Sequence, residues 1–348
     1  MHGGNVWQGG APGDWLDFSA NIRPEGPPEW VRTALADALC EVSYYPDLAM
    51  RRAREGLAAY LGLDPARVLP TAGGIAAISL VNGLDADTVT VTAPGFGEYA
   101  ATALQAGKRV WSVPFDPRAA RSPAEALLQS GVLGGVVWLC DPQNPTGGAS
   151  APEEVEALLS AVERAGGWLA VDEAFIDYCP ELSARRLLAE HARLIVVGSL
   201  TKILGIPGVR LGYVCAAPEV IREFEQRQLP WSLNCFASAV AVALPEHAQE
   251  IRLDAQANRV RRDWLRAALQ ALGVFVYPSE APFLLAHFDR PVAAVAAKLK
   301  ERRILVRECL DFAGIDDGRH LRLAVKTEAA NARLIADLRE ALTCAENP

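Results

Sequence analysis

Three polar residues that could do chemistry follow three short apolar runs at nearly equal spacing. Asn144 comes after "VVWLC", Asp172 after "WLAV" and Lys202 after "LIVV", at spacings of 28 and 30 positions. Each interval is about the length of one strand–helix unit. Ligands bind at the carboxyl ends of the strands in an open parallel sheet. The spacing therefore predicts that one edge of one sheet carries all three side chains.

A pair of glycines precedes these residues. "TAGG" (71–74) follows "VLP" and opens a predicted helix, so Gly73 and Gly74 leave backbone N–H groups free at the positive end of the helix dipole. That arrangement suits a phosphate. Ser199 and Arg210, within "GSLTKILGIPGVRLGY" (198–213), could complete the phosphate site with charge-assisted hydrogen bonds.

A lysine, a carboxylate, an amide and a phosphate site together are what pyridoxal 5′-phosphate requires. The Lys202 amine would form a Schiff base with the cofactor aldehyde, and Asp172 would keep the ring nitrogen protonated so that the ring accepts electrons. Asn144 could donate to the phenolate oxygen. Each element has an ordinary explanation on its own: "NPTG" is usually a turn, and a strand-end lysine can hold its amine in solvent. Their order and spacing favour the cofactor.

Composition excludes several classes of protein. The chain has 348 residues, 22% of them charged, a net charge of −8 and a pI near 5.3, which argues against nucleic acid or an anionic membrane as the main partner. An anionic small substrate would then need a local cluster of arginines. "MHGGNVWQGG" has no apolar signal segment and no apolar run reaches membrane-spanning length, so we expect a cytoplasmic protein.

The cysteines and histidines show no metal-binding pattern. The seven cysteines include no C-x-x-C, and the nearest two, Cys215 and Cys235, lie 20 residues apart. The five histidines are dispersed. We therefore expect neither a disulfide framework nor a metal site.

The pattern of apolar runs and helical segments divides the chain into an α/β region and a second region of mixed helices and strands. From 53 to 215, continuous apolar runs alternate with helical segments, which predicts a mainly parallel sheet covered by helices on both faces. Beyond 235, one long helical stretch (236–272) precedes short strands and helices, which indicates a smaller α+β domain. We predict an N-terminal arm at 1–28 outside the core, a large cofactor-binding domain at 29–235 and a small domain at 236–348.

Several motifs resemble a known superfamily. "NPTG" (144–147), "DEAFIDY" (172–178) and "SLTK" with "PGVRLGY" (199–213) resemble the fold-type I aminotransferases, specifically the histidinol-phosphate aminotransferase branch. Within it, "HGGN" (2–5), "LDFSANIRPEG" (16–26), "YPD" (45–47), "APGFGEY" (93–99) and "LPWSLN" (229–234) resemble the decarboxylases of phosphorylated threonine in cobalamin biosynthesis. The resemblance implies a pyridoxal-phosphate enzyme of fold type I that forms a homodimer with shared active sites.

The resemblance also assigns roles to residues. It agrees with the roles given above to Lys202, Asp172 and Asn144, and it places Phe96 against the face of the cofactor ring. It further implies that Ser199, Arg210 and the backbone of Gly73 and Gly74 hold the cofactor phosphate, with Tyr45 reaching in from the other subunit. By the same resemblance, contacts to the substrate come from Asn144, Arg307, Arg322, Asn21, His2 and Gly3.

The activity implied is decarboxylation of L-threonine O-3-phosphate, a phosphorylated amino acid, to (R)-1-amino-2-propanol O-2-phosphate without an amino acceptor. Transamination of histidinol phosphate with 2-oxoglutarate, on the same scaffold, is the main alternative. One departure is Phe175, where the branch often has tyrosine; the phenolate oxygen would then depend on Asn144 alone.

Three other interpretations fit less well. "SLTK" also matches the S-x-x-K motif of serine acyl-enzymes, with Ser199 as nucleophile, but the chain lacks S-D-N and offers only "KTE" (326–328) for K-T-G. A cofactor-free Schiff-base enzyme would leave Asp172, Asn144 and "TAGG" unexplained. A regulator that binds the cofactor without catalysis would carry a DNA-binding module, and none is visible.

Overall fold

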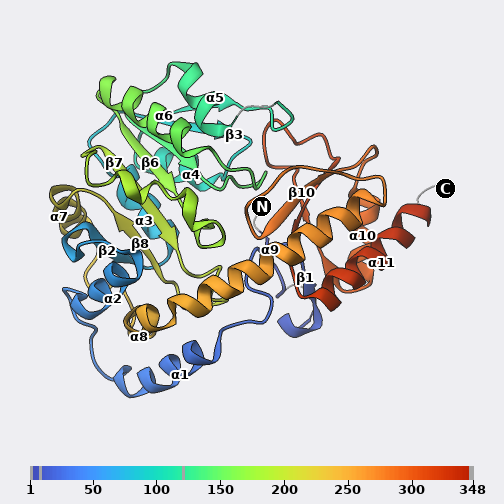
Figure 1. The fold of residues 1–348 in the computed structure, drawn as a ribbon, viewed down its shortest axis with the longest axis horizontal. Coiled ribbons are helices and arrows are strands. Elements are labelled where there is room, and N and C mark those ends of the chain that lie inside the picture. Colours follow the sequence, from blue (N-terminus) through green and yellow to red (C-terminus); the bar gives the residue numbers. More distant parts are fainter. Residues whose placement is uncertain (1–2, 8–9, 120–121, 345–348) are drawn as a thin grey trace.

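A seven-stranded sheet forms the centre of the computed structural model, which describes residues 3–7, 10–119 and 122–344 (Figure 1). The strands lie in the order β2 (Val68–Thr71), β8 (Gly212–Cys215), β7 (Leu194–Ser199), β6 (Trp168–Asp172), β5 (Val136–Cys140), β3 (Thr88–Ala93) and β4 (Arg109–Pro114). Neighbouring strands are parallel except for β8, which pairs antiparallel with both β2 and β7. The predicted mainly parallel sheet is confirmed.

Helices cover both faces of this sheet, because its strands are apolar on both sides. In β5, Val137 and Leu139 belong to one buried cluster, whereas Val136 and Trp138 belong to another. The first cluster includes residues of α1 (Glu29–Asp37), α2 (Arg51–Leu61), α5 (Pro123–Ser130), α6 (Pro152–Arg164) and α8 (Cys235–Ala243). The second includes residues of α3 (Gly74–Asn82), α4 (Glu98–Gln105) and α7 (Pro218–Arg227).

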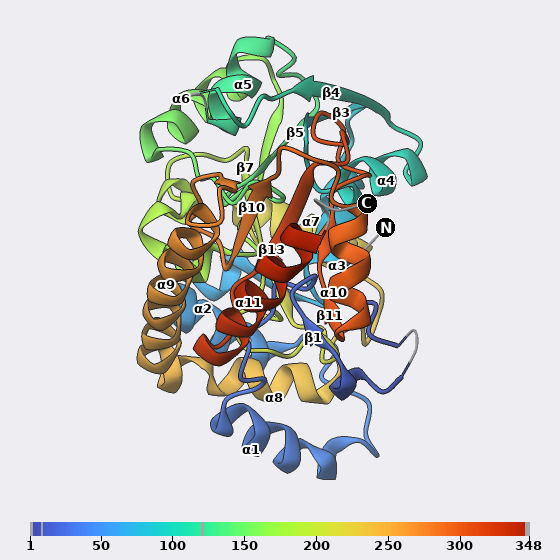
Figure 2. The ribbon, with the colours of Figure 1, turned by 90° about the vertical axis from the view of Figure 1, so that its right-hand side faces the viewer.

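The C-terminal part of the chain builds an antiparallel sheet of four strands. Their order is β12 (Arg307–Glu308), β13 (His320–Ala324), β10 (Phe283–His287) and β9 (Phe275–Val276). Figure 2 shows α9 (Ala248–Gln270), α10 (Ala293–Glu301) and α11 (Glu328–Cys344) on this side of the molecule. Leu321 and Leu323 of β13 are fully buried with residues of these helices, so the predicted smaller α+β unit is confirmed.

The long helix predicted at 236–272 is interrupted. It consists of α8, a 3₁₀ turn at Leu244–His247, and α9. Pro245 explains the break, because proline cannot donate a backbone hydrogen bond and its ring clashes with the preceding turn. α8 packs on α1 and α2, and α9 then runs diagonally across the molecule to the small sheet (Figure 1). The predicted domain division at residue 235 stays a prediction.

The N-terminal arm is partly a core segment, which the sequence analysis did not expect. β1 (Leu16–Asp17) pairs in parallel with β11 (Ile304–Leu305), and the Phe18 N–H donates to the Leu305 carbonyl at 2.8 Å. Phe18 is fully buried among residues of the small unit. The prediction that the first 28 residues lie outside the core is wrong for this stretch, because a Gly- and Pro-rich background hid one short strand.

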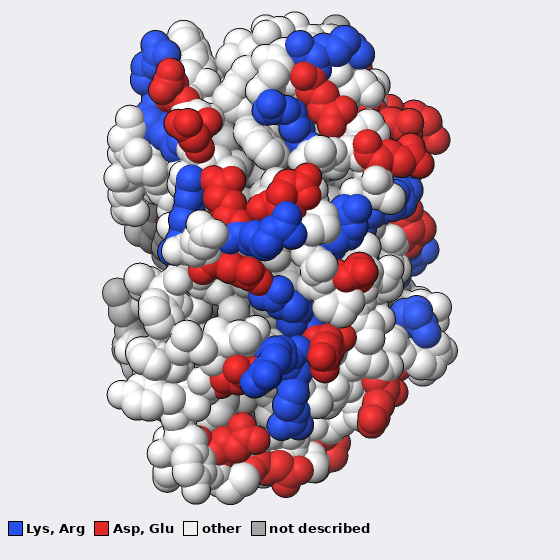
Figure 3. All heavy atoms as spheres, turned by 90° about the vertical axis from the view of Figure 1, so that its left-hand side faces the viewer, with Lys and Arg blue, Asp and Glu red and all other residues white. Residues whose placement is uncertain are grey.

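Surface charge is mixed on the face at the left of Figure 1. Figure 3 shows acidic and basic side chains interspersed there rather than one field of a single sign. In the part of the chain that the structure describes, no helix combines the length and the apolar character needed to span a bilayer. Nor do any three His, Cys, Asp or Glu side chains among those residues gather closely enough to bind a metal ion.

Candidate active site

Three adjacent strand ends carry the residues that the spacing selected. β5, β6 and β7 are parallel neighbours, with Cys140 opposite Asp172 and Asp172 opposite Val197. Asp172 is the last residue of β6; Asn144 follows the end of β5, and Lys202 follows the end of β7. The prediction that one sheet edge carries these residues is therefore confirmed.

Asp172 is a buried carboxylate with two hydrogen-bond donors. Its Oδ2 accepts from the Tyr99 hydroxyl at 2.6 Å and its Oδ1 from the Ala174 N–H at 2.9 Å. Burial raises the pKa of Asp172, while these bonds and the nearby charge of Lys202 act in the opposite direction. Both donors favour the ionised carboxylate, which is the form that a protonated ring nitrogen needs as its partner.

Lys202 lies among charges that make its amine a better nucleophile. Burial lowers the pKa of Lys202 to about 8; the cations Arg210 and Arg322 lower it too, and Asp172 acts against them. A larger fraction of the amine is therefore uncharged near neutral pH than in an ordinary lysine. Asp172 ends β6 of the large sheet, whereas Arg322 lies in β13 of the small, four-stranded sheet. The edge of the large sheet that carries Asn144, Asp172 and Lys202, here called the cofactor edge, therefore meets the small sheet around Lys202.

The predicted phosphate residues come together at the start of α3. A Cβ added at Gly73 would lie 2.5 Å from Arg210 Nη2, and one at Gly74 would lie 3.4 Å from Ser199 Cβ. Gly73 also has a φ of +78°, which side chains rarely adopt. The Ser199 hydroxyl is 2.8 Å from the hydroxyl of Thr201. N–H groups at a helix start, a hydroxyl and a guanidinium in contact fit a phosphate monoester.

Arg322 connects the small sheet to the cofactor edge. Its Nη1 donates to Asn144 Oδ1 at 2.6 Å, its Nη2 donates to the Ser19 carbonyl at 2.8 Å, and its guanidinium lies 5.4 Å from the Phe283 ring centre. The bond to Asn144 orients that amide, because its oxygen faces Arg322 and its NH2 group faces away. The NH2 group is the end that could donate to a phenolate.

Two arginines face each other in the small sheet. Arg307 of β12 pairs directly with Arg322 of β13, and both are buried. Asp311 accepts from Arg307 Nη2 at 2.6 and 2.8 Å, whereas no carboxylate pairs with Arg322 among the described residues. Burial lowers the pKa of Arg322 to about 10, and the charge of Arg307 contributes to this. Like charges opposite each other destabilise a sheet, so the pair indicates an anionic ligand.

The start of the arm packs beside this arginine. The Gly4 N–H donates to Ser19 Oγ at 2.8 Å, and a Cβ at Gly3 would lie 2.1 Å from the Ser19 carbonyl oxygen, the same oxygen that binds Arg322. Gly3 therefore lies close to the arginine pair. His2, the other predicted contact from "HGGN", lies outside the described residues.

Asn21 has a polar atom that lacks a partner. The residue is 6% exposed, and its Oδ1 is buried without a hydrogen-bond partner among the described residues. Lys326 holds the chain on both sides of it, with Nζ donating to the carbonyls of Ala20 and Ile22 at 3.2 and 3.4 Å. Asn21 thus has a fixed backbone and an oxygen free to accept from a ligand.

Arg23 ties the arm to two other parts of the molecule. Its backbone N–H donates to the Lys202 carbonyl at 3.0 Å, and its guanidinium donates to the Asp254 carboxylate of α9 at 2.8 and 3.2 Å. The arm is therefore bonded directly to the lysine loop.

Two aromatic residues discussed from the sequence lie in apolar surroundings. Phe96 is half-buried, with its ring edge-on to Tyr99 at 5.5 Å. Phe175 is buried and meets the Phe283 ring edge-on at 5.1 Å. Stacking of Phe96 on the cofactor stays a prediction.

Tyr45 is 82% exposed, and its ring centre lies 4.8 Å from that of Trp231. Its predicted role in the site of a second subunit is not tested by a single chain.

Three contributors to the site were not predicted from the sequence: Tyr99, Ser19 and Lys326. Tyr99 and Ser19 lie inside quoted motifs, "APGFGEY" and "LDFSANIRPEG", but only the fold shows which groups they bind. Lys326 had no signal beyond being one of five lysines.

The sheet order, the strand-end residues and the phosphate residues at α3 define a pyridoxal-phosphate enzyme of fold type I. The family model "Aminotransferase class I and II" matches residues 13–338. The chain therefore belongs to the class I and II aminotransferases, and its cofactor is pyridoxal 5′-phosphate.

Relatives in this family have two different activities. A threonine-phosphate decarboxylase from Salmonella typhimurium is 32% identical, covering 98% of this chain and 96% of that protein. A histidinol-phosphate aminotransferase from Symbiobacterium thermophilum is also 32% identical, covering 94% and 91%. The structure of the histidinol-phosphate aminotransferase from Sinorhizobium meliloti in complex with pyridoxal 5′-phosphate has a similar fold, with a TM-score of 0.85, 22% identity and coverage of 94% and 90%.

Proposed function

We propose that this enzyme decarboxylates L-threonine O-3-phosphate to (R)-1-amino-2-propanol O-2-phosphate, without an amino acceptor, as a step of cobalamin biosynthesis. The observation that carries the proposal is the contact between the two decarboxylase-like stretches of the arm. Gly3 and Gly4 of "HGGN" pack on Ser19 of "LDFSANI", and the Ser19 carbonyl binds Arg322. The segments that distinguish the decarboxylases therefore meet at the predicted substrate arginine.

The arginine pair supports a substrate with two anionic ends. Phosphothreonine carries a carboxylate and a phosphate, and Arg307 and Arg322 are two cations held side by side on adjacent strands. Guanidinium groups bind both kinds of anion through paired, charge-assisted hydrogen bonds. The buried Nε of Arg322 and Oδ1 of Asn21, which have no partner among the described residues, are available to such a substrate.

The cofactor residues have the following proposed roles. When bound, pyridoxal phosphate withdraws electrons from the substrate α-carbon while one of its bonds breaks. Asp172 would pair with the ring nitrogen, and the Asn144 NH2 group would donate to the phenolate oxygen. Lys202 holds the cofactor through its amine and then supplies the proton that takes the place of the departing CO2 on the α-carbon.

Orientation of the substrate selects the reaction. The bond that breaks is the one held perpendicular to the cofactor ring, so a decarboxylase must direct the carboxylate there and an aminotransferase the α-hydrogen. Lys202, Asp172 and Asn144 serve both reactions equally. We assign the choice to Arg307, Arg322 and the arm, since these groups hold the ends of the substrate.

The second candidate is transamination of histidinol phosphate with 2-oxoglutarate. The 32% identity to the Symbiobacterium aminotransferase favours it as much as overall similarity favours the decarboxylase. Histidinol phosphate has a phosphate and no carboxylate, so it would engage a single cluster of cations.

The decisive experiment supplies phosphothreonine without 2-oxoglutarate and measures CO2 release, alongside histidinol phosphate with 2-oxoglutarate. We expect CO2 and the amino-propanol phosphate from the first mixture and little turnover in the second. The Lys202→Ala protein serves as the inactive control. Turnover of histidinol phosphate that depends on 2-oxoglutarate, with no CO2 from phosphothreonine, would assign the enzyme to transamination.

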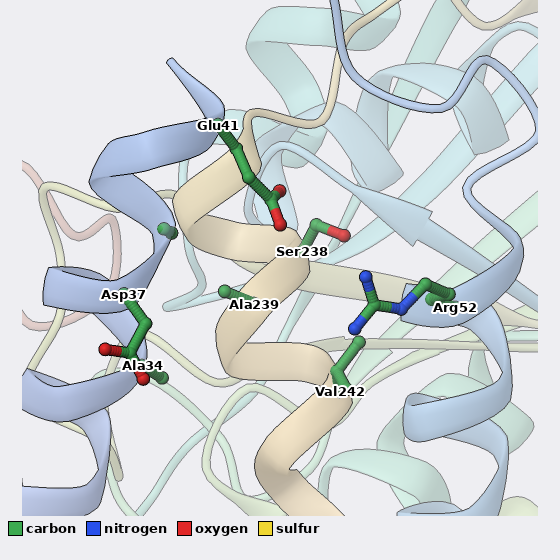
Figure 4. A pocket seen from close by; sticks show the side chains of 8 residues that line it. Ala34, Asp37, Glu41, Arg52, Ser238, Ala239 and Val242 are labelled. Carbon is green, nitrogen blue, oxygen red and sulfur yellow. The ribbon is translucent and has the colours of Figure 1, made fainter. Parts of the chain in front are cut away.

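We also propose a homodimer in which Tyr45 completes the partner's site. Leu39, Val42, Tyr44, Tyr45 and Trp231 are all large apolar or aromatic side chains, and each is at least 49% exposed in the single chain. Exposed apolar patches of this kind mark interfaces. Leu39 and Val42 are chain neighbours of Ala38 and Glu41, which line a hollow between α1, α2 and α8. Eight residues line this hollow: Ala34, Asp37, Ala38, Glu41, Arg52, Ser238, Ala239 and Val242 (Figure 4).

Subunit complementation tests this shared site. Lys202→Ala and a Tyr45→Ala protein, each inactive by itself, should regain part of the activity when their subunits exchange, because one of the two sites in a mixed dimer is intact. No recovery despite demonstrated exchange would place Tyr45 in its own subunit's site or outside both.

A further inference from the structure

We propose that Tyr99 is a positioning residue that keeps Asp172 ionised and thereby keeps the proton on the cofactor's ring nitrogen. This inference rests on the proposed role of Asp172. It starts from the Tyr99 hydroxyl, which donates to Asp172 Oδ2 at 2.6 Å. That distance is typical of an O–H group bonded to a charged oxygen, a class of hydrogen bond about twice as strong as a neutral one.

Tyr99 of α4 is held by contacts with β5 and α3. It stacks on Trp138 of β5, with ring centres 4.7 Å apart and planes 12° apart. Trp138 Nε1 donates to Asn82 Oδ1 of α3 at 2.9 Å, and Asn82 Nδ2 donates back to the Tyr99 carbonyl at 3.0 Å. Tyr99, Trp138 and Asn82 therefore each contact the other two, which joins α4, β5 and α3. The hydroxyl is therefore fixed at the end of β6 before any cofactor binds.

The surroundings of Asp172 make this donor important. Burial raises the pKa of Asp172 and so favours its neutral form; the Tyr99 hydroxyl, the Ala174 N–H and the charge of Lys202 oppose that effect. Burial, followed by the charge of Asp172, holds the pKa of Tyr99 well above its usual range, so Tyr99 keeps its proton and stays a donor. Burial likewise raises the pKa of the neighbouring Cys140 thiol, which therefore stays neutral.

Asp172 and the ring nitrogen would share one proton. A hydrogen bond from Tyr99 stabilises the carboxylate more than the carboxylic acid, so it favours the state in which the proton lies on nitrogen. A ring protonated at nitrogen is the stronger electron acceptor. Tyr99 would thus influence the reaction without touching the substrate.

The chain offers a matched control at Tyr60. The Tyr60 hydroxyl donates to Asp177 Oδ1 at 2.7 Å, and that aspartate is also buried. Tyr60→Phe removes a bond of the same kind from a carboxylate that has no proposed part in the reaction. Both Tyr99→Phe and Tyr60→Phe keep the ring and remove one hydroxyl, so a purely structural role predicts the same pattern for both.

Two titrations measure the effect without using activity. In the cofactor-free protein, carboxyl carbon NMR follows the titration of Asp172; in the loaded protein, the chemical shift of a ¹⁵N-labelled ring nitrogen reports its protonation. Tyr99→Phe should raise the pKa of Asp172 and move the ring nitrogen toward its unprotonated shift. With phosphothreonine, kcat should fall about 10- to 100-fold, the effect of one hydrogen bond to a charged group, with little change in KM. Tyr60→Phe should change none of these quantities.

A second variant keeps the test decisive if Tyr99→Phe unfolds. A more acidic fluorotyrosine placed at position 99 strengthens the donor while keeping the ring, so it should lower the pKa of Asp172. An unchanged Asp172 titration in both Tyr99 variants, or the same change in Tyr60→Phe, would overturn the inference. A shifted titration together with no CO2 from phosphothreonine would instead reject the proposed function and leave the role of Tyr99 intact.

Discussion

The cofactor edge of the large sheet and the arginine pair of the small sheet differ in how far their polar groups are satisfied. At the cofactor edge, Asp172 accepts two hydrogen bonds and Ser199 has a hydroxyl partner, all from within the chain. At the arginine pair, Arg322 Nε and Asn21 Oδ1 are buried without a partner among the described residues. The named polar groups of the first region already have partners within the chain, and we expect a ligand to supply the missing partners in the second.

This difference explains how related enzymes can share chemistry and differ in substrate. A buried polar group without a partner costs about 1–3 kcal/mol. A substrate that supplies the missing partners recovers that free energy, and one that cannot is rejected. We therefore expect changes at the cofactor edge to abolish all reactions, and changes around Arg322 to alter which substrate reacts.

Removing Lys202 should have the largest effect on activity, because its amine is proposed both to bind the cofactor and to supply a proton. The substrate region should stay intact. We expect Lys202→Ala to lose activity by on the order of 10²–10⁴-fold or more, while phosphothreonine still raises the melting temperature through the arginine pair. Borohydride reduction of the original protein should place the cofactor on the peptide that contains Lys202. Lys108→Ala is the control, since the Lys108 amine donates to the carbonyls of Leu84 and Ala86. Cofactor attached at Lys108 or Lys326 would contradict the assignment.

Removing Arg322 should act mainly on substrate binding. A buried, hydrogen-bonded cation of this kind is worth about 2–5 kcal/mol, so Arg322→Met should lower kcat/KM for phosphothreonine by about 30- to 1,000-fold or more. The absorbance of the bound cofactor should persist. Steady-state kinetics and the visible spectrum measure the two quantities. Arg319→Met, an exposed arginine on the same segment, is the control and should react normally.

The pH dependence of cofactor binding by Lys202 should also depend on Arg322, a residue of the other region. Only the uncharged Lys202 amine attacks the aldehyde, and its pKa is lowered to about 8 from the ordinary 10.5. The rate at which the cofactor-free protein captures pyridoxal phosphate should therefore rise through about pH 8 and level off above it. Arg322→Met removes a neighbouring positive charge, so its midpoint should move to higher pH. Stopped-flow absorbance measures the rate, and a midpoint near 10.5 in the original protein would show that Lys202 is not perturbed.

Lys326 should have the smallest effect, because it acts on the arm rather than on the substrate. Lys326→Met removes the donor to the Ala20 and Ile22 carbonyls and should lower the free energy of unfolding by about 1 kcal/mol. KM for phosphothreonine should rise a few-fold as Asn21 loses its fixed position, with kcat unchanged. Chemical denaturation and kinetics test this; a fall in kcat alone would assign Lys326 a different role. Lys300→Met, at an exposed lysine of α10, provides the baseline.

The sequence predicted the cofactor edge well because that region depends on local patterns. Apolar runs locate strands, and the carboxyl ends of neighbouring parallel strands necessarily meet, so Asn144, Asp172 and Lys202 could be brought together without coordinates. The prediction of one helix over 236–272 took no account of Pro245, the residue at which the helix breaks.

Contacts that depend on strand register could not be predicted in the same way. Arg307 and Arg322 face each other only because β12 and β13 pair in one particular register, and a shift of one residue would turn one of them to the other face. The bond from Tyr99 to Asp172 and the burial of Phe18 likewise join segments distant in the chain. Such contacts follow from packing, which no local pattern encodes.

The hydrogen bonds of Arg23 determine how much of the N-terminal arm could be replaced by that of a related enzyme. The N–H of Arg23 is bonded to the Lys202 carbonyl and its guanidinium to Asp254 of α9. A chimaera that replaces residues 1–22 keeps both bonds while it exchanges Ser19 and Asn21 together with β1 and the buried Phe18. A graft that extends through residue 23 also has to supply a cation in place of the Arg23 guanidinium, or it leaves the Asp254 carboxylate without that partner. Substrate preference should therefore transfer with a shorter graft more readily than with a longer one.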